Sequence, residues 1–148
     1  MREQKYLTPL RIELCVKGLN CMGINAFSNE WFAFGDMDYE AAQYLLGMPK
    51  RSNEIICYHC QQGAEKYLKG YIFIQGAEAK KTHNLISLCK KCIEFDKEFE
   101  AIMDECSDLT SYAVMVRYPF HIDLEEADVL LAIKNVSRII DFIKSKTT

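Results

Sequence analysis

The stretch from Glu54 to Gln75 constrains the fold of this 148-residue chain more than any other part of the sequence. Its apolar residues recur every three or four positions, which is the spacing of one face of an α-helix. The side that we predict to be buried carries Ile56, Cys57, Cys60, Ala64, Tyr67, Leu68, Tyr71 and Ile72. The opposite side carries Tyr58, His59, Gln61, Gln62, Glu65, Lys66 and Lys69. This mixture of amides, charges and an imidazole has more hydrogen-bonding groups than a merely solvated face needs. We therefore expect residues with a function on this side.

The same periodicity predicts further helices before and after this one, joined by short loops. Their predicted N-terminal caps are Ser28 or Asn29, Ser52, Thr82, Asp96 and Asp123. Gly47, Gly76 and Pro119 are expected to end helices. No stretch shows the sustained alternation of polar and apolar residues that is typical of a β-strand. We therefore predict an all-α fold, an antiparallel up-and-down bundle of four or five helices.

The beginning of the chain is expected to add an extra N-terminal segment to this bundle. Thr8 and Pro9 suit the start of a short helix. Three helix-breaking residues follow, after which a loop is expected to lead to residue 28; they are Gly18, Asn20 and Gly23. A chain of this length suits one domain with one core. We therefore predict an N-terminal extension at residues 1–28 and a single helical domain at residues 29–146.

The charge balance excludes a general attraction to nucleic acid. The chain has 18 Lys and Arg against 21 Asp and Glu, a formal net charge of -3, so any phosphate must be bound by a local group of cations. No apolar stretch approaches the roughly 20 residues that cross a bilayer, and the charged start lacks an apolar signal core. We expect a cytoplasmic protein that does not enter membranes.

The seven cysteines are expected to be reduced, because their number is odd and no secretory signal precedes them. Two pairs, Cys57 with Cys60 and Cys89 with Cys92, have the spacing that supplies four thiolates to zinc. Both pairs lie on the apolar stripes of predicted helices, and free cysteine packs well as a small apolar residue. We therefore predict that they belong to the core, and we predict neither a metal nor another cofactor.

Three groups of residues have the chemistry to bind an anion. The segment Lys81–His83 stands at the start of a predicted helix, where free backbone N–H groups and the helix dipole favour a phosphate. Glu65 and Lys69 are spaced for an ion pair, which is either an ordinary surface pair or part of a polar site. Arg117 offers a planar fork of donors, and His121 could perform acid–base chemistry on an RNA 2′-hydroxyl.

Three blocks of sequence carry a resemblance to a known family. They are Tyr58-His59-Cys60-Gln61-Gln62 with Ala64-Glu65-Lys66-Tyr67-Leu68-Lys69, then Lys81-Thr82-His83-Asn84-Leu85, and finally Arg117-Tyr118-Pro119. In this order they resemble the signature of the HEPN family, the higher eukaryote and prokaryote nucleotide-binding domain. The likeness covers approximately Trp31 to Lys144. It implies a helical bundle, in agreement with the periodicity.

The resemblance to the Arg-Tyr-Pro branch, of the prokaryotic stand-alone type, implies a non-catalytic module that binds a nucleotide or a partner protein. Such proteins frequently act beside a minimal nucleotidyltransferase, so a partner in trans is implied, and we also expect a homodimer. The implied ligand-binding residues are Lys66, Lys69, Lys81, His83 and Arg117, and the supporting residues are Gln62, Glu65 and Tyr118.

A second hypothesis is a metal-independent HEPN ribonuclease, the toxin of a toxin–antitoxin pair, with Arg117, His121 and His83 as catalytic candidates in a dimer. Ribonucleases of the family resemble one another in an Arg followed by four to six residues and then a His. Here three residues separate Arg117 from His121, and Pro119 is one of them, so the two side chains cannot share a regular helical face. The sequence therefore favours the binding module, and a helical scaffold without a ligand is a third alternative.

Overall fold

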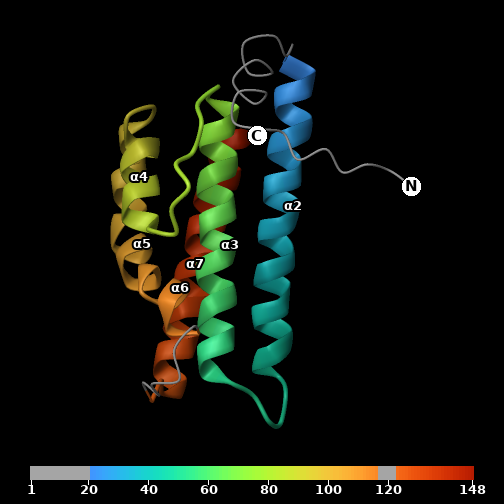
Figure 1. Ribbon diagram of the computed structural model, residues 1–148, viewed down its shortest axis with the longest axis vertical. Helices are drawn as coiled ribbons and strands as arrows, with labels where there is room; N and C mark the ends of the chain where they lie inside the picture. Colours follow the sequence, from blue (N-terminus) through green and yellow to red (C-terminus); the bar gives the residue numbers. More distant parts are fainter. Residues whose placement is uncertain (1–20, 117–122) are drawn as a thin grey trace, which may run out of the picture.

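The computed structural model describes residues 21–116 and 123–148, which form helices and, within those ranges, no β-strand. The elements are α2 (Cys21–Leu46), α3 (Asn53–Ile74), α4 (Leu85–Ile93), the 3₁₀-helix η1 (Lys97–Ile102), α5 (Met103–Thr110), α6 (Tyr112–Met115) and α7 (Glu126–Thr147). The long helices α2, α3 and α7 lie side by side, with α4 and α5 against the other flank of α3 (Figure 1). The predicted all-α bundle is confirmed.

Helix α3 is the centre of this bundle, because it contacts α2, α4, α5, α6 and α7. All eight residues of its predicted apolar side are buried. Gln61 and Glu65, from the predicted polar side, are buried as well. The reason is visible in Figure 1, where the segment between α3 and α4 runs back along α3. The central helix is therefore covered on more sides than its apolar periodicity indicates.

Helices α2 and α3 approach each other closely where both carry glycine. A β-carbon at Gly35 of α2 would lie 2.6 Å from Cδ2 of Tyr67 and 3.3 Å from the backbone oxygen of Gly63. Tyr67 is held in place because its hydroxyl donates a hydrogen bond to Asp36 at 2.6 Å. The close approach of the two backbones therefore depends on the absence of a side chain at residue 35.

Both predicted ends of α3 are confirmed. Ser52 is its N-cap, accepting a hydrogen bond from the backbone N–H of Ile55 at 3.3 Å. Gly76 follows the last turn with a φ of 73°, a conformation that glycine adopts without steric cost.

Two predicted caps are wrong by two residues. Asn84, and not Thr82, caps α4, because its side-chain oxygen reaches the N–H of Ser87, three residues on, at 3.0 Å. The last helix begins after Glu125 and not after Asp123, since Asp128 accepts the N–H of Glu125 at 2.8 Å. In both places several residues that can act as an N-cap lie close together. The cap is the one that forms a hydrogen bond with the third residue of the helix.

The predicted loop before residue 28 is also wrong, because α2 already begins at Cys21 and runs through Gly23. Glycine inside a helix costs about 1 kcal/mol relative to alanine. Packing offsets this cost, since Ser28 is buried and the ring of Phe27 lies 6.1 Å from that of Phe73. The predicted helix after Thr8 lies outside the described residues.

Asp96 caps a helix as predicted, but the single helix expected after it is divided into η1, α5 and α6. Helix α5 ends at Thr110, whose hydroxyl donates to the backbone oxygen of Cys106 at 2.9 Å and accepts from the N–H of Leu85 at 3.0 Å. Such back-bonding to the preceding turn bends helices. It also ties the end of α5 to the start of α4.

The cysteines of both CxxC pairs are buried and unpaired, as the packing prediction expects. Burial raises the pKa of Cys57 and of Cys60 to about 12, so these thiols stay protonated at neutral pH. Among the described residues no group of three or more His, Cys, Asp or Glu is arranged around a metal position. Of the helices described, none is long and apolar enough to cross a membrane.

Replacing Gly35 by alanine is expected to destabilise the protein. Overpacking of this kind costs about 1–3 kcal/mol, which exceeds the roughly 1 kcal/mol that alanine contributes in a helix. Urea unfolding measures the difference, and Gly47→Ala is the matched control, because its β-carbon would make only an ordinary contact of 3.6 Å. A Gly35→Ala protein as stable as the parent would show that α2 and α3 do not approach as described.

Candidate functional site

A buried carboxylate, that of Glu65 on α3, organises the polar side of the central helix. Its Oε1 accepts a hydrogen bond from the ammonium group of Lys69 at 2.7 Å, and its Oε2 accepts one from the amide of Gln61 at 3.0 Å. Nδ1 of His83 lies 3.0 Å from Oε2. Gln61 also donates to the backbone oxygen of His83 at 3.0 Å. The carboxylate therefore connects α3 to the segment that precedes α4.

Two opposing effects act on the pKa of Glu65. Burial raises it, whereas the hydrogen bonds from Lys69, Gln61 and His83, together with the charge of Lys69, lower it. The second group of effects prevails, and the pKa lies below the ordinary value of a glutamate. Glu65 is therefore ionised at neutral pH, and its charge is compensated inside the fold.

His83 differs from its predicted position in the first turn of a helix, since α4 begins only at Leu85. Its side chain is 54% exposed, and Nδ1 is the ring atom that faces Glu65. Gln62 extends the same network, because its amide donates to the side-chain oxygen of Gln61 at 2.7 Å. The structure thus brings together four of the predicted site residues, namely Gln62, Glu65, Lys69 and His83.

A second polar network joins α2 to α3 through Asp38. Its Oδ1 lies 2.8 Å from Nδ1 of His59, and its Oδ2 pairs with the ammonium group of Lys66. Lys66 is therefore engaged with α2 and does not line the recess described next. Asp38 was not predicted as this partner, although a carboxylate among the apolar positions of a helix is a signal that a cation faces it.

Lys69 and Lys81 line the same recess, of about 230 Å³, between α2, α3 and the segment before α4. The ammonium group of Lys69 lies 5.9 Å from the centre of the Trp31 ring. The other lining residues are Phe73, Glu78, Ala79 and Lys80. The sequence predicted the two lysines but not the aromatic rings or Lys80. No local signal in the sequence joins Trp31 to Lys69, because the two lie on different predicted helices.

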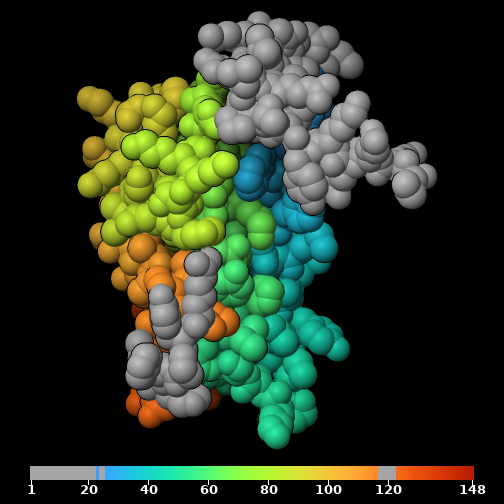
Figure 2. Space-filling model, in the orientation of Figure 1, coloured from blue at the N-terminus to red at the C-terminus, as the bar shows by residue number. Residues whose placement is uncertain are grey.

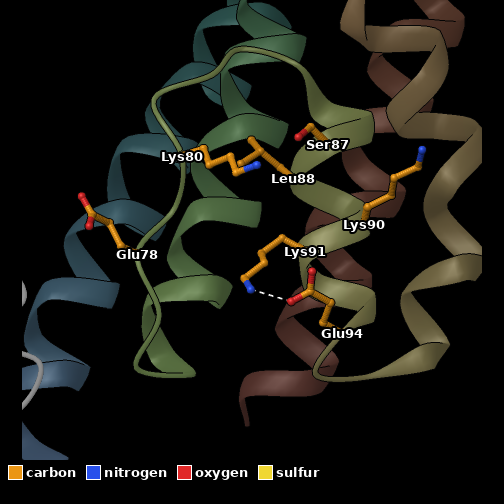
Figure 3. A pocket seen from close by; sticks show the side chains of 7 residues that line it. All are labelled: Glu78, Lys80, Ser87, Leu88, Lys90, Lys91 and Glu94. Carbon is orange, nitrogen blue, oxygen red and sulfur yellow. Dashed lines mark hydrogen bonds and ion pairs between the residues drawn. The ribbon is translucent and has the colours of Figure 1, made fainter.

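A second recess of about 420 Å³ adjoins the first, and the two share Glu78 and Lys80. Figure 3 shows Lys80 extending toward α4 and Lys91 extending from α4 toward the segment that carries Lys80. Lys91 also pairs with Glu94 at 2.5 Å. The remaining lining residues are Ser87, Leu88 and Lys90. The two recesses together are lined by five lysines and two glutamates, so this part of a chain of net charge -3 is locally cationic.

The remaining predicted site residues, Arg117, Tyr118 and His121, lie outside the described residues. What the described part offers is a set of ammonium groups beside two aromatic rings. Ammonium groups suit phosphate oxygens, and aromatic rings suit the flat face of a base. Lys80 and Lys81 are exposed and form no ion pair with any described residue.

These features define a class of protein: a small all-α bundle with a polar site built on its central helix and on the segment that follows it. The model of the HEPN domain family matches residues 28–146, so this chain belongs to the HEPN domain family. The match includes both networks and both recesses described above.

A solved structure supports the fold. The chain is similar to the crystal structure of TT1696 from Thermus thermophilus, with a TM-score of 0.70 and 21% identity. The similarity covers 80% of this chain and 97% of that chain. None of the curated proteins compared with the chain matches it.

Replacing Glu65 by glutamine is expected to cost about 2–4 kcal/mol of unfolding free energy at neutral pH, because Lys69 is left with an uncompensated charge. The folded pKa lies below the unfolded value, so the carboxylate stabilises the fold above the unfolded pKa. That stabilisation is lost as the pH falls through the folded pKa. The difference in unfolding free energy between parent and variant should therefore reach its full size above about pH 5 and become smaller below about pH 4.

Urea unfolding at a series of pH values measures this difference. Glu40→Gln is the control, because Glu40 is exposed and forms no ion pair with a described residue; it should change stability by less than about 0.5 kcal/mol. A constant difference between parent and Glu65→Gln from pH 7 to pH 3 would contradict the prediction.

Proposed function

We propose that this HEPN domain is a non-catalytic module that binds a nucleotide in the recess lined by Lys69 and Lys81. The observation that carries the proposal is the meeting of these two lysines, from separate stretches of the chain, beside Trp31. The phosphate would be bound by Lys81 and Lys80, whose charges are uncompensated among the described residues. Lys69, held by Glu65, would contribute a fixed donor at the base of the recess.

The base of the nucleotide would stack on the exposed part of Trp31 or Phe73. Stacking of a base on an aromatic side chain contributes about 1–3 kcal/mol and needs no particular base. This chemistry suits a nucleotide better than an inorganic phosphate, which has no flat apolar face. Glu65, Gln62 and His83 position the binding groups, and Arg117 and Tyr118 would add donors from the segment outside the described residues.

We also propose a branch of the family and a partner protein for this chain. We infer that the chain belongs to the Arg-Tyr-Pro branch of the family, of the prokaryotic stand-alone type, with its domain at residues 29–146, and that it acts with a minimal nucleotidyltransferase in trans. The support is the sequence Arg117-Tyr118-Pro119 and the short separation of Arg117 from His121, which departs from the ribonuclease pattern. A homodimer remains a prediction that sedimentation analysis would test.

Lys81→Ala is expected to weaken the binding of ATP by about tenfold, because a hydrogen bond to a charged group contributes about 1.5–3 kcal/mol. Arg117→Ala should have a similar effect. Titration calorimetry measures both affinities, and Lys134→Ala on α7, an exposed lysine without an ion pair to a described residue, is the control. Unchanged affinity of Lys81→Ala would remove the recess from consideration.

Purified protein is expected to leave mixed RNA intact during incubation in chelator, because the chain is proposed to bind without cleaving. Gel electrophoresis reads the result directly. Cleavage that disappears in His121→Ala or in His83→Ala would establish the ribonuclease instead. Cleavage that persists in both variants would come from a contaminating nuclease and leaves the chain without a cleaving role.

A further inference from the structure

Helix α2 presents an outward apolar stripe that no described residue covers. It lies at one edge of the bundle, packed against α3 and touching α7 (Figures 1 and 2). On its outer side the exposed fractions of Phe34, Met37 and Tyr44 are 56%, 62% and 79%. Single exposed apolar residues are ordinary on protein surfaces, but several large ones grouped on one side of a helix mark an interaction site.

The row has the spacing of a coiled-coil seam. Its members, here called the α2 seam, are Glu30, Phe34, Met37, Ala41 and Tyr44. Successive members are separated alternately by three and four residues, which is the heptad pattern that keeps one stripe of a helix against a neighbouring helix. Met48, 40% exposed, continues the row just beyond the helix end. The pattern therefore suits a helix as the occupant.

The shape of the surface agrees with this pattern. A recess of about 360 Å³ on α2 is lined by Glu30, Ala33, Phe34 and Met37. Four residues with these spacings form the hole that receives one side chain of a facing helix in coiled-coil packing. Three of the four are apolar, and Glu30 supplies a carboxylate at the edge. The recess is therefore suited to an apolar side chain with a cation beside it.

The charge of α2 indicates which helix would fit. Between Cys21 and Leu46 there are four carboxylates and no lysine or arginine. Asp36 and Asp38 are engaged with cations of α7 and α3, respectively. Glu30 and Glu40 are exposed and form no ion pair with a described residue. The α2 seam thus contains one exposed carboxylate, Glu30, has a second, Glu40, beside it, and has no cation on its own helix.

A second copy of this chain packed α2 against α2 is a poor occupant for that reason. Packed along the seam, the facing α2 would offer Glu30 and Glu40 no cation from its own helical residues, and like charges beside a seam disfavour pairing. The predicted homodimer would then use a different surface. A helix with lysine or arginine beside its apolar stripe would instead satisfy both carboxylates.

We propose that the α2 seam is the docking surface for an amphipathic helix of a partner protein whose apolar stripe is flanked by lysine or arginine. The proposal is independent of the nucleotide site, since the α2 seam shares no residue with either cationic recess. Affinity would come from the apolar seam, and the choice of partner from the flanking charges.

Two synthetic helical peptides of about three heptads test the proposal, both with leucine and isoleucine at the seam positions. One carries lysine at the flanking positions and the other glutamate. Fluorescence anisotropy with the full-length chain is expected to show at least tenfold tighter binding of the lysine peptide. The preference should decrease at high salt, because screening shortens the range of the charges. Equal binding of both peptides, or binding of neither, would overturn the proposal.

Variants of the chain locate the site. Phe34→Asp is expected to abolish binding of the lysine peptide, and the double change of Glu30 and Glu40 to lysine should reverse the preference toward the glutamate peptide. Leu130→Asp is the matched control on α7, because Leu130 is exposed to a similar extent, 51%. It should leave binding unchanged, and loss of binding in this control alone would assign the peptide to α7.

Two other occupants give different results. If sedimentation shows that the parent chain self-associates and that Phe34→Asp dissociates it, a second copy covers the α2 seam. If Phe34→Asp lowers the thermal stability of a monomeric chain well beyond Leu130→Asp, a segment of the chain itself covers the seam. Either result overturns the proposal.

Discussion

The compensation of one buried charge determines how the polar side of this protein is arranged. Removing a carboxylate from water costs several kcal/mol unless donors replace the lost water. Glu65 receives them from Lys69 and Gln61, with His83 beside it. Because His83 belongs to the segment before α4, the same compensation holds that segment against α3 and brings Lys81 to the recess beside Trp31.

A second constraint is the close approach of α2 and α3. Gly35 and Gly63 allow the two backbones to come together, and Asp38 adds a polar connection to His59 and Lys66. One side of α2 is thereby fixed against α3, and the opposite side, which carries the α2 seam, is turned outward. Two surfaces of different chemistry result: a cationic hollow with aromatic rings, and an apolar stripe flanked by carboxylates. The two surfaces share no residue.

Much of the fold could be predicted because helical periodicity is a local property. The buried side of α3, the cap at Ser52 and the end at Gly76 all follow from residues within a few positions of one another. The predictions that failed concern competition between neighbours. Asn84 and not Thr82 caps α4, because the side chain of Asn84 reaches the N–H of Ser87. Helix α2 continues through Gly23, because packing against α3 offsets the cost of a glycine in a helix. The break of the expected helix at Thr110 depends on Leu85, which is distant in sequence.

By itself the sequence determined the helical class, the residues of the core and the presence of polar groups on one side of α3, since each depends on residue type and spacing. Only the tertiary structure decided how those groups are paired. It separated Lys66 from Lys69 by giving them carboxylates on different helices, joined Lys81 to Trp31, and left one side of α2 uncovered by any other described residue. Pairing depends on distances across the bundle, and these are set by how helices pack and not by spacing along the chain.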